Sequence, residues 1–165
     1  MKIKKSLVFL AVFMVSVLAF SGCSGNGGNN LKSKTDFSLN EEATLKTLKI
    51  TAVAIEESQG EEYFEPEDGN TFVGVKFEIE NTSSEAINIS SLLQFSASAD
   101  DVMLEYSFNA AIAFDDGTLD GTVNPGKKLI GWYAVEVNED WETLEIKFVE
   151  DILYENKYIT FTFNN

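Results

Sequence analysis

The feature that most constrains the fold is a two-residue alternation of apolar and polar side chains. It is clearest in residues 71–81, where odd positions are apolar and most even positions are charged (Val73, Val75, Phe77 and Ile79 against Lys76, Glu78 and Glu80). Successive side chains of a strand point to opposite faces of its sheet, so this pattern predicts a strand with one buried and one solvated face.

Similar segments recur along the chain between residues 43 and 165. Strands are predicted at 48–55 (less regular), 71–81, 86–89, 93–99, 102–108, 110–114, 133–137, 144–148 and 159–163. Gly, Asn, Asp and Ser separate them, and Pro66 and Pro125 both fall in predicted loops. A short helical turn is also predicted at 90–93, with Ser90 as its cap. About seven to nine short antiparallel strands predict an all-β sandwich.

The amino terminus has the pattern of an export signal. Lys2, Lys4 and Lys5 precede residues 7–20, which are apolar except for Ser16. Fourteen helical residues span about 21 Å, which is short of the roughly 30 Å hydrocarbon core of a membrane. A basic start, a short apolar run and small residues predict a signal peptide over residues 1–22.

The residues that follow resemble a bacterial lipoprotein signal. Ser21, Gly22 and Cys23 match the end of a lipobox, although Phe20 stands where that motif has a smaller aliphatic residue. The resemblance implies that Cys23 becomes the mature amino terminus and carries diacylglycerol, and two acyl chains anchor a protein stably. Two alternatives to a lipoprotein remain: an ordinary secreted protein in which the cysteine has no role, and a protein whose uncleaved signal segment anchors it in the membrane. The expected location is the extracytoplasmic face of the cell membrane.

A linker is predicted between this cysteine and the sandwich. Residues 24–30 contain only Ser, Gly and Asn, and few large apolar side chains follow before residue 43. Such a composition cannot bury enough apolar surface to fold by itself. The predicted organisation is therefore a signal peptide at 1–22, lipidated Cys23 with a flexible linker at 23–42, and a β-sandwich at 43–165.

The charge of the chain excludes several functions. It contains 12 Lys, 27 Asp and Glu, and neither Arg nor His, for a net charge of −15. Removal of residues 1–22 leaves 9 Lys against the same acids, or −18. No basic patch for nucleic acid is present, and anionic lipids would repel the chain at long range. The membrane contact is therefore attributed to the lipid anchor, and the acidic surface to solvation or to a cationic partner.

Acidic loops are the main candidates for chemistry. They contain Glu61, Glu62, Glu65, Glu67 and Asp68, then Asp100 and Asp101, then Asp115, Asp116 and Asp120. Carboxylates at loop ends are ligands for Ca²⁺, but solvated turn residues give the same pattern, so no metal or other cofactor is predicted. Without His, acid–base or Ser-based catalysis has little support, and the protein is predicted not to be an enzyme. Trp132 is expected to be half-buried in a strand, and Trp141 to be exposed.

Two blocks of sequence resemble a known family. Residues 71–83 end a hydrophobic strand on Asn81-Thr82-Ser83, and Asn124-Pro125-Gly126 is followed by an aromatic strand that begins at Gly131-Trp132-Tyr133. Both blocks are similar to those of the DUF4352 domain, over about residues 43–163. The resemblance implies an immunoglobulin-like sandwich, often found in Gram-positive lipoproteins, and assigns no catalytic residues.

The sequence thus predicts a membrane-anchored extracytoplasmic lipoprotein whose sandwich is a non-catalytic binding module. Its partner would be a protein, a peptide or a cell-wall component, and no binding residue is identified. The alternative is a lipoprotein that binds a divalent metal or small ligand, such as a sensor or a transport accessory.

Overall fold

The structure is a computed structural model that describes residues 34–114, 117–154 and 157–165. Cys23, the predicted signal peptide and residues 24–33 lie outside the described residues. The described strands are β1 (Asp36–Phe37), β2 (Glu42–Thr44), β3 (Leu48–Ser58), β4 (Asn70–Asn81), β5 (Ile87–Ile89), β6 (Phe95–Ala99), β7 (Val102–Leu104), β8 (Gly121–Val123), β9 (Lys128–Asn138), β10 (Thr143–Val149) and β11 (Tyr158–Asn164). The helices are α1 (Ser91–Gln94), α2 (Phe108–Ile112) and the 3₁₀ turn η1 (Ile152–Tyr154).

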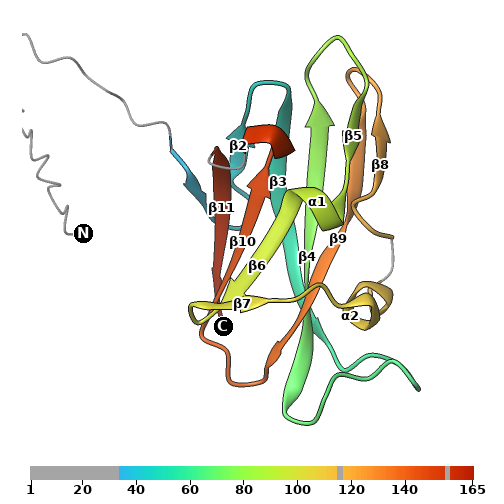
Figure 1. Cartoon of the computed structure of the whole chain (residues 1–165), viewed down its shortest axis with the longest axis vertical. Helices are drawn as coiled ribbons and strands as arrows, with labels where there is room; N and C mark the ends of the chain where they lie inside the picture. The colour runs from blue at the N-terminus through green and yellow to red at the C-terminus, as the bar shows by residue number, and fades with distance from the viewer. Residues whose placement is uncertain (1–33, 115–116, 155–156) are drawn as a thin grey trace, which may run out of the picture. The chain divides into compact units, whose positions relative to one another are not determined.

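Two sheets form the sandwich, as Figure 1 shows. One has the order β1-β11-β10-β6-β7 and the other β2-β3-β4-β9, while β5 and β8 form a separate two-stranded ladder. The predicted all-β, immunoglobulin-like sandwich is confirmed, with eleven described strands rather than seven to nine. The strand pairs within the predicted sandwich are antiparallel, as expected, and β1, which precedes residue 43, adds a parallel pairing with β11.

The core lies between the two sheets and is rich in phenylalanine. Val73, Val75, Phe77 and Ile79 of β4 are all fully buried, which confirms the alternation predicted for that strand. The Phe77 ring meets the Phe161 ring edge-on, with 5.1 Å between centroids. Full burial of such a side chain contributes about 1.5–3 kcal/mol, so these residues hold the sheets together.

The weaker alternation in β3 has a structural cause. The pairing of β3 with β4 shifts register between Ala52 and Ala54, which leaves Val53 in a β-bulge. Before the bulge Ala52 faces the main core, whereas after it Ile55 takes that side. One extra residue therefore reverses the phase of the pattern in the middle of the strand.

The strand predicted at 110–114 is wrong, because Ala110 lies in helix α2 and the chain turns after it. Ser107 Oγ accepts a hydrogen bond from the Ala110 N–H at 3.2 Å and caps the helix. Ala110 and Phe114 are buried in a second apolar cluster, against the outer side of β4 and β9. Five helical residues are too few to show a helical period in the sequence.

Gly74 makes room for this second cluster. A Cβ at position 74 would lie 2.7 Å from the Phe114 ring, closer than side-chain contacts allow. Phe114 in turn packs on Trp132, with 5.1 Å between ring centroids. The prediction that Trp132 is half-buried is therefore wrong, since only 7% of it is exposed.

The predicted linker end at residue 42 is wrong, because the folded body begins earlier. Phe37 in β1 is 8% exposed and its ring packs on Phe161. The Thr160 N–H also donates to the Thr35 carbonyl at 2.8 Å. Isolated apolar residues in a polar segment gave no periodicity, so the sequence did not show that Phe37 fills the core.

The helical turn predicted at 90–93 is present as α1, but Ser90 does not cap it. Asp120 takes that role from 29 residues away: its carboxylate accepts from the Ser91 N–H at 3.0 Å and from Ser91 Oγ at 2.7 Å. Partial burial raises the pKa of Asp120, but hydrogen bonds from Ser91, Thr118 and Ser90 together hold the pKa below its usual value. This contact joins α1 to the segment before β8.

The sandwich has two ends of different charge. We call one the acidic end: the loops 59–69, 100–101 and 139–142, which lie low in Figure 1. We call the other the lysine end: Lys34 and the loops 45–47, 82–86 and 124–127 with residues 150–154 and 157. Among the described residues of the lysine end, four lysines (Lys34, Lys46, Lys127 and Lys157) accompany three acids (Glu85, Glu150 and Asp151), and Glu155 lies outside the described residues.

Candidate functional site

The three loops of the acidic end are joined to one another by backbone hydrogen bonds. The Glu139 N–H donates to the Gly69 carbonyl at 3.0 Å, and the Asp100 N–H donates to the Thr143 carbonyl at 2.9 Å. Together these fully described loops contain ten exposed acids and no lysine: Glu61, Glu62, Glu65, Glu67, Asp68, Asp100, Asp101, Glu139, Asp140 and Glu142. The fold therefore gathers acidic segments that are far apart in the sequence.

Asp100 and Asp101 form the turn between β6 and β7. Both have positive φ angles, 48° and 67°, a conformation that Asp tolerates better than most residues. The Asp100 carboxylate accepts from the Glu142 N–H at 3.1 Å and from the Thr143 N–H at 2.8 Å. Asp100 thus organises the neighbouring loop, whereas Asp101 is exposed.

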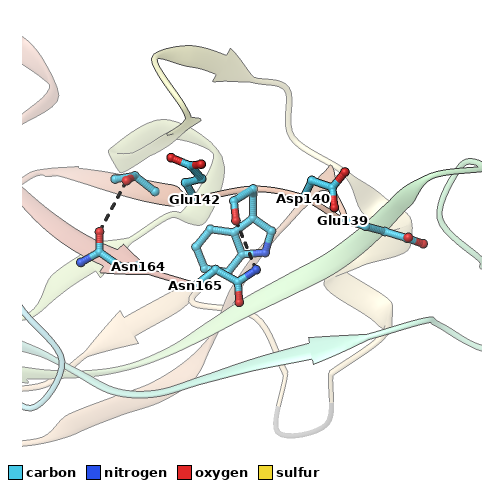
Figure 2. A pocket seen from close by; sticks show the side chains of 7 residues that line it. Glu139, Asp140, Glu142, Asn164 and Asn165 are labelled. Carbon is cyan, nitrogen blue, oxygen red and sulfur yellow. Dashed lines mark hydrogen bonds between the residues drawn. The ribbon is translucent and has the colours of Figure 1, made fainter.

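An open hollow of about 710 Å³ lies beside the loop between β9 and β10 (Figure 2). Glu139, Asp140 and Glu142 line it together with Asn164 and Asn165. The Asn165 side-chain N–H donates to the Trp141 carbonyl at 3.2 Å, which ties the end of β11 to this loop. The hollow therefore offers carboxylate and amide groups to solvent.

The prediction that Trp141 is exposed is wrong. Only 4% of Trp141 is exposed, and its indole N–H donates to the Glu57 carboxylate at 3.0 Å. Trp141 packs with the main core, so it supports the acidic end from beneath. The burial of Trp141 could not be predicted from its position in a polar turn, because the sequence does not show that this turn folds back over β3.

An exposed tyrosine stands in the first acidic loop. Tyr63 is 86% exposed and has a φ of 76°, within a turn closed by a bridge between Glu61 and Phe64. A Cβ at Gly60 would lie 2.1 Å from the Phe64 carbonyl oxygen, so glycine is required there for the turn to close. Sequence reasoning missed Tyr63, although an aromatic pair among four glutamates was a visible signal.

The alternative reading of the acidic loops as calcium ligands gains no support from the described residues. Within residues 34–114, 117–154 and 157–165, no three Asp, Glu, Cys or His side chains are grouped so as to hold a metal ion. Asp100 and Asp120 bind the protein's own N–H and hydroxyl groups. Asp115 and Asp116 lie outside the described residues.

The two sequence blocks that resembled a family meet at the lysine end. Asn81 is fully buried, and its side-chain N–H group donates to the Val123 carbonyl at 2.8 Å and to the Glu85 carbonyl at 2.7 Å. Its Oδ1 accepts from the Ser83 N–H at 2.9 Å, so Asn81 also turns the chain at the end of β4. The Gly126 N–H donates to the Asn81 carbonyl at 2.9 Å, and Gly126 has a φ of 68°.

The two sequence blocks are therefore joined by hydrogen bonds: the Gly126 N–H donates to the Asn81 carbonyl, and the Asn81 N–H donates to the Lys127 carbonyl. The model of DUF4352, described as a domain of unknown function, matches residues 37–159. The chain belongs to the DUF4352 family. The family match begins at Phe37, in agreement with the folded body, which begins before residue 43.

Solved structures share this fold at low sequence identity. A protein described as a candidate lipoprotein, ycdA of Bacillus subtilis, is 17% identical with a TM-score of 0.62; the match covers 81% of this chain and 39% of that one. A β-sandwich protein of Clostridium difficile is 17% identical with a TM-score of 0.51, covering 81% and 97%. The yjhA protein of Bacillus subtilis is 10% identical with a TM-score of 0.54, covering 76% and 97%.

The remaining comparisons assign no activity. No curated protein matches the sequence. In the part of the chain that the structure describes, no helix is long and apolar enough to cross a membrane. Lipidation of Cys23 stays a prediction, because that residue lies outside the described part.

Proposed function

We propose that the protein is a lipid-anchored extracytoplasmic lipoprotein whose acidic end binds a cationic segment of a protein or peptide, without catalysis. The observation that carries the proposal is the separation of charge between the two ends. The acidic end has ten exposed carboxylates and no lysine, while the chain from Cys23 enters the sandwich through Lys34 at the lysine end.

The position of Lys34 supports an arrangement with the acidic end away from the anchor. β1 begins at Asp36 and runs parallel to β11, which ends next to the acidic end at Asn164. Eleven residues from Cys23 to Lys34 cannot extend beyond about 40 Å. A lipid on Cys23 would therefore hold Lys34 within about 40 Å of the membrane, and the acidic loops, at the opposite end of the sandwich from Lys34, could face away from it.

The chemistry of the acidic end supports a cationic partner. Carboxylates on several loops, with no lysine among them, create a negative potential that attracts cations over about a Debye length. Tyr63 adds an exposed ring, and aromatic faces attract Lys and Arg side chains. The hollow beside Asp140 is open to solvent, so an extended peptide can enter it, and its lining offers both carboxylate and amide groups.

The anchor is tested by a substitution at the proposed lipidation site. In cells that express the full chain, Cys23→Ser should abolish incorporation of labelled fatty acid and release the protein from the membrane fraction. Ser24→Ala, which leaves Cys23 in place, is the matched control and should be labelled like the wild type. Equal labelling of the Cys23→Ser variant would refute the anchor.

The binding site is tested with a fluorescent oligolysine peptide and the full-length protein in detergent. Replacing Glu62, Asp101 and Asp140 by their amides should weaken binding roughly tenfold, at about 0.5 kcal/mol for each exposed ion pair. Glu85→Gln, at the lysine end, is the control and should leave the affinity unchanged. Equal binding by the triple variant and the wild type would refute the proposed site.

A further inference from the structure

Strand β7 forms one outer edge of the five-stranded sheet, and among the described strands only β6 pairs with it. Two of its three residues are apolar and exposed, Val102 at 65% and Met103 at 62%. An edge strand has unpaired N–H and C=O groups, and proteins usually protect such an edge with charged side chains or proline. β7 itself contains neither, so its edge is open to pairing with another strand.

The other edges of the two main sheets are shorter, polar or partly covered. In the four-stranded sheet, β2 presents the exposed polar residues Glu42 and Thr44 at one edge. At the other edge, the Trp132 N–H of β9 donates to the Gly117 carbonyl at 3.0 Å, so part of this edge is already bonded. β1 is only two residues long, and one of them is buried. β7 is therefore the least protected of these four edges in the part of the chain that the structure describes.

The inner side of β7 is apolar. Val102 lies opposite Ala99, which is buried in the core, and residues directly opposite each other in a ladder share a face of the sheet. Leu104, two residues further on, is on the same side and is partly buried against the core. Met103 lies between them and points to the outer side of the sheet. A strand added beside β7 would therefore meet apolar side chains on its inner face.

The outer side of the sheet next to β7 is acidic. Met103 lies opposite Ser98 of β6, which in turn lies opposite Glu145 of β10. Ser98 and Glu145 line a hollow of about 510 Å³ together with Asp101, and its described lining contains no lysine. Glu105, directly after β7, is also exposed. A strand added beside β7 would therefore have carboxylates near its outer face.

We propose that β7 pairs with an extended segment of the partner in which apolar residues alternate with lysine or arginine. The inference rests on the proposed function, because the turn of Asp100 and Asp101 belongs to the acidic end and leads directly into β7. Main-chain hydrogen bonds to β7 supply affinity, and the alternating side chains supply specificity. The apolar face of the segment covers Val102, and its cationic face meets the carboxylates.

The charges argue against a second copy of this chain as the occupant. If two β7 strands paired antiparallel about Met103, Asp101 of each copy would lie opposite Glu105 of the other. A parallel pairing in register would set each acid beside the same acid. Like charges directly opposite each other destabilise a ladder. A cationic segment is instead attracted to the same carboxylates.

The test compares two fluorescent peptides with the same number of lysines: oligolysine, and a peptide that alternates lysine and valine. Full-length protein in detergent should bind the alternating peptide roughly tenfold more tightly, because its valines cover Val102. The bound alternating peptide should slow amide hydrogen exchange in residues 102–104 and leave β2, an edge strand of the same length, unchanged. Equal affinity for both peptides, or binding without protection of residues 102–104, would overturn the pairing and leave the acidic site in place. Binding of neither peptide would overturn the proposed function as well.

A pair of matched variants separates the strand edge from the charge. Val102→Ser with Met103→Ser should abolish the preference for the alternating peptide, while oligolysine binds as it does to the wild type. Leu92→Ser with Leu93→Ser, at residues of α1 that are 63% and 64% exposed, is the control and should keep the preference. Loss of the preference in both variants, or in neither, would contradict the proposal. Protection of residues 102–104 that rises with protein concentration, before any peptide is added, would show that a second copy occupies the edge instead.

Discussion

Two asparagines that end neighbouring strands show how differently the two ends of the sandwich are built. Asn81 ends β4 at the lysine end, is fully buried, and binds the Glu85 and Val123 carbonyls. Asn138 ends β9 at the acidic end and is exposed, with hydrogen bonds to the Gly69 carbonyl and from the Asp140 N–H. Loss of a hydrogen bond costs more free energy when the partner group is buried than when it is exposed to water. We therefore expect the hydrogen bonds of Asn81 at the lysine end to contribute more to stability than those of Asn138 at the acidic end.

The largest expected effect comes from removing the buried asparagine. Asn81→Ala leaves the buried Val123 carbonyl without its side-chain partner, so the free energy of unfolding should fall by about 3 kcal/mol. Asn138→Ala, the same change at the acidic end, should lower it by less than about 1 kcal/mol. Urea denaturation measures both, and equal losses would show that the two ends are built alike.

A smaller effect is expected at the carboxylate that caps α1. Asp120→Ala should lower the free energy of unfolding by about 1 kcal/mol, the usual value of an N-cap. Because its pKa is lowered in the folded protein, this stabilisation is complete above the unfolded value of 3.8 and is lost as the pH falls through the folded pKa.

The matched substitution for that comparison is Asp101→Ala at the acidic end. Asp101 is exposed, so its removal should change stability by no more than about 0.5 kcal/mol. Thermal unfolding at a series of pH values measures both variants. A difference between wild type and Asp120→Ala that grows as the pH falls below 3.8 would contradict the assigned role of Asp120.

The smallest effect concerns repulsion among the acidic loops. Neutralising Glu62, Asp101 and Asp140 together should raise the free energy of unfolding by a few tenths of a kcal/mol at low salt, because like charges then repel less. The gain should vanish near 1 M salt, where the Debye length is about 3 Å. Replacing Lys46 and Lys157 by Gln should bring no gain. A gain in both variants would argue against a difference between the ends.

The sandwich itself could be predicted from the sequence because one buried face imposes a strict alternation on a strand. That logic identified β4, β9, β10 and β11 and the turns at Asn81 and Pro125. Alternation is a poor guide where both faces of a strand are buried, or where a helix rather than a second sheet covers one of the faces. Phe72 is buried on the outer side of β4 only because α2 folds over it, and α2 is too short to show a period.

The candidate surfaces were less predictable than the fold. The acidic residues were visible in the sequence, but their grouping depends on which loops lie at the same end of the sandwich. The same holds for α1 and the end of β10, which are joined by the hydrogen bond from Gln94 to the Val149 carbonyl, 55 residues away. Trp141 was misjudged for a related reason, since a residue in a turn is buried when the turn closes over the core.

The central claim is that this sandwich is tied to a membrane through Cys23. The most direct test is the intact mass of the full-length protein extracted from membranes, with fragmentation of its amino terminus. The account predicts a chain that begins at Cys23 and carries diacylglycerol on the sulfur. A chain that retains residues 1–22, or one with an unmodified Cys23, would contradict it.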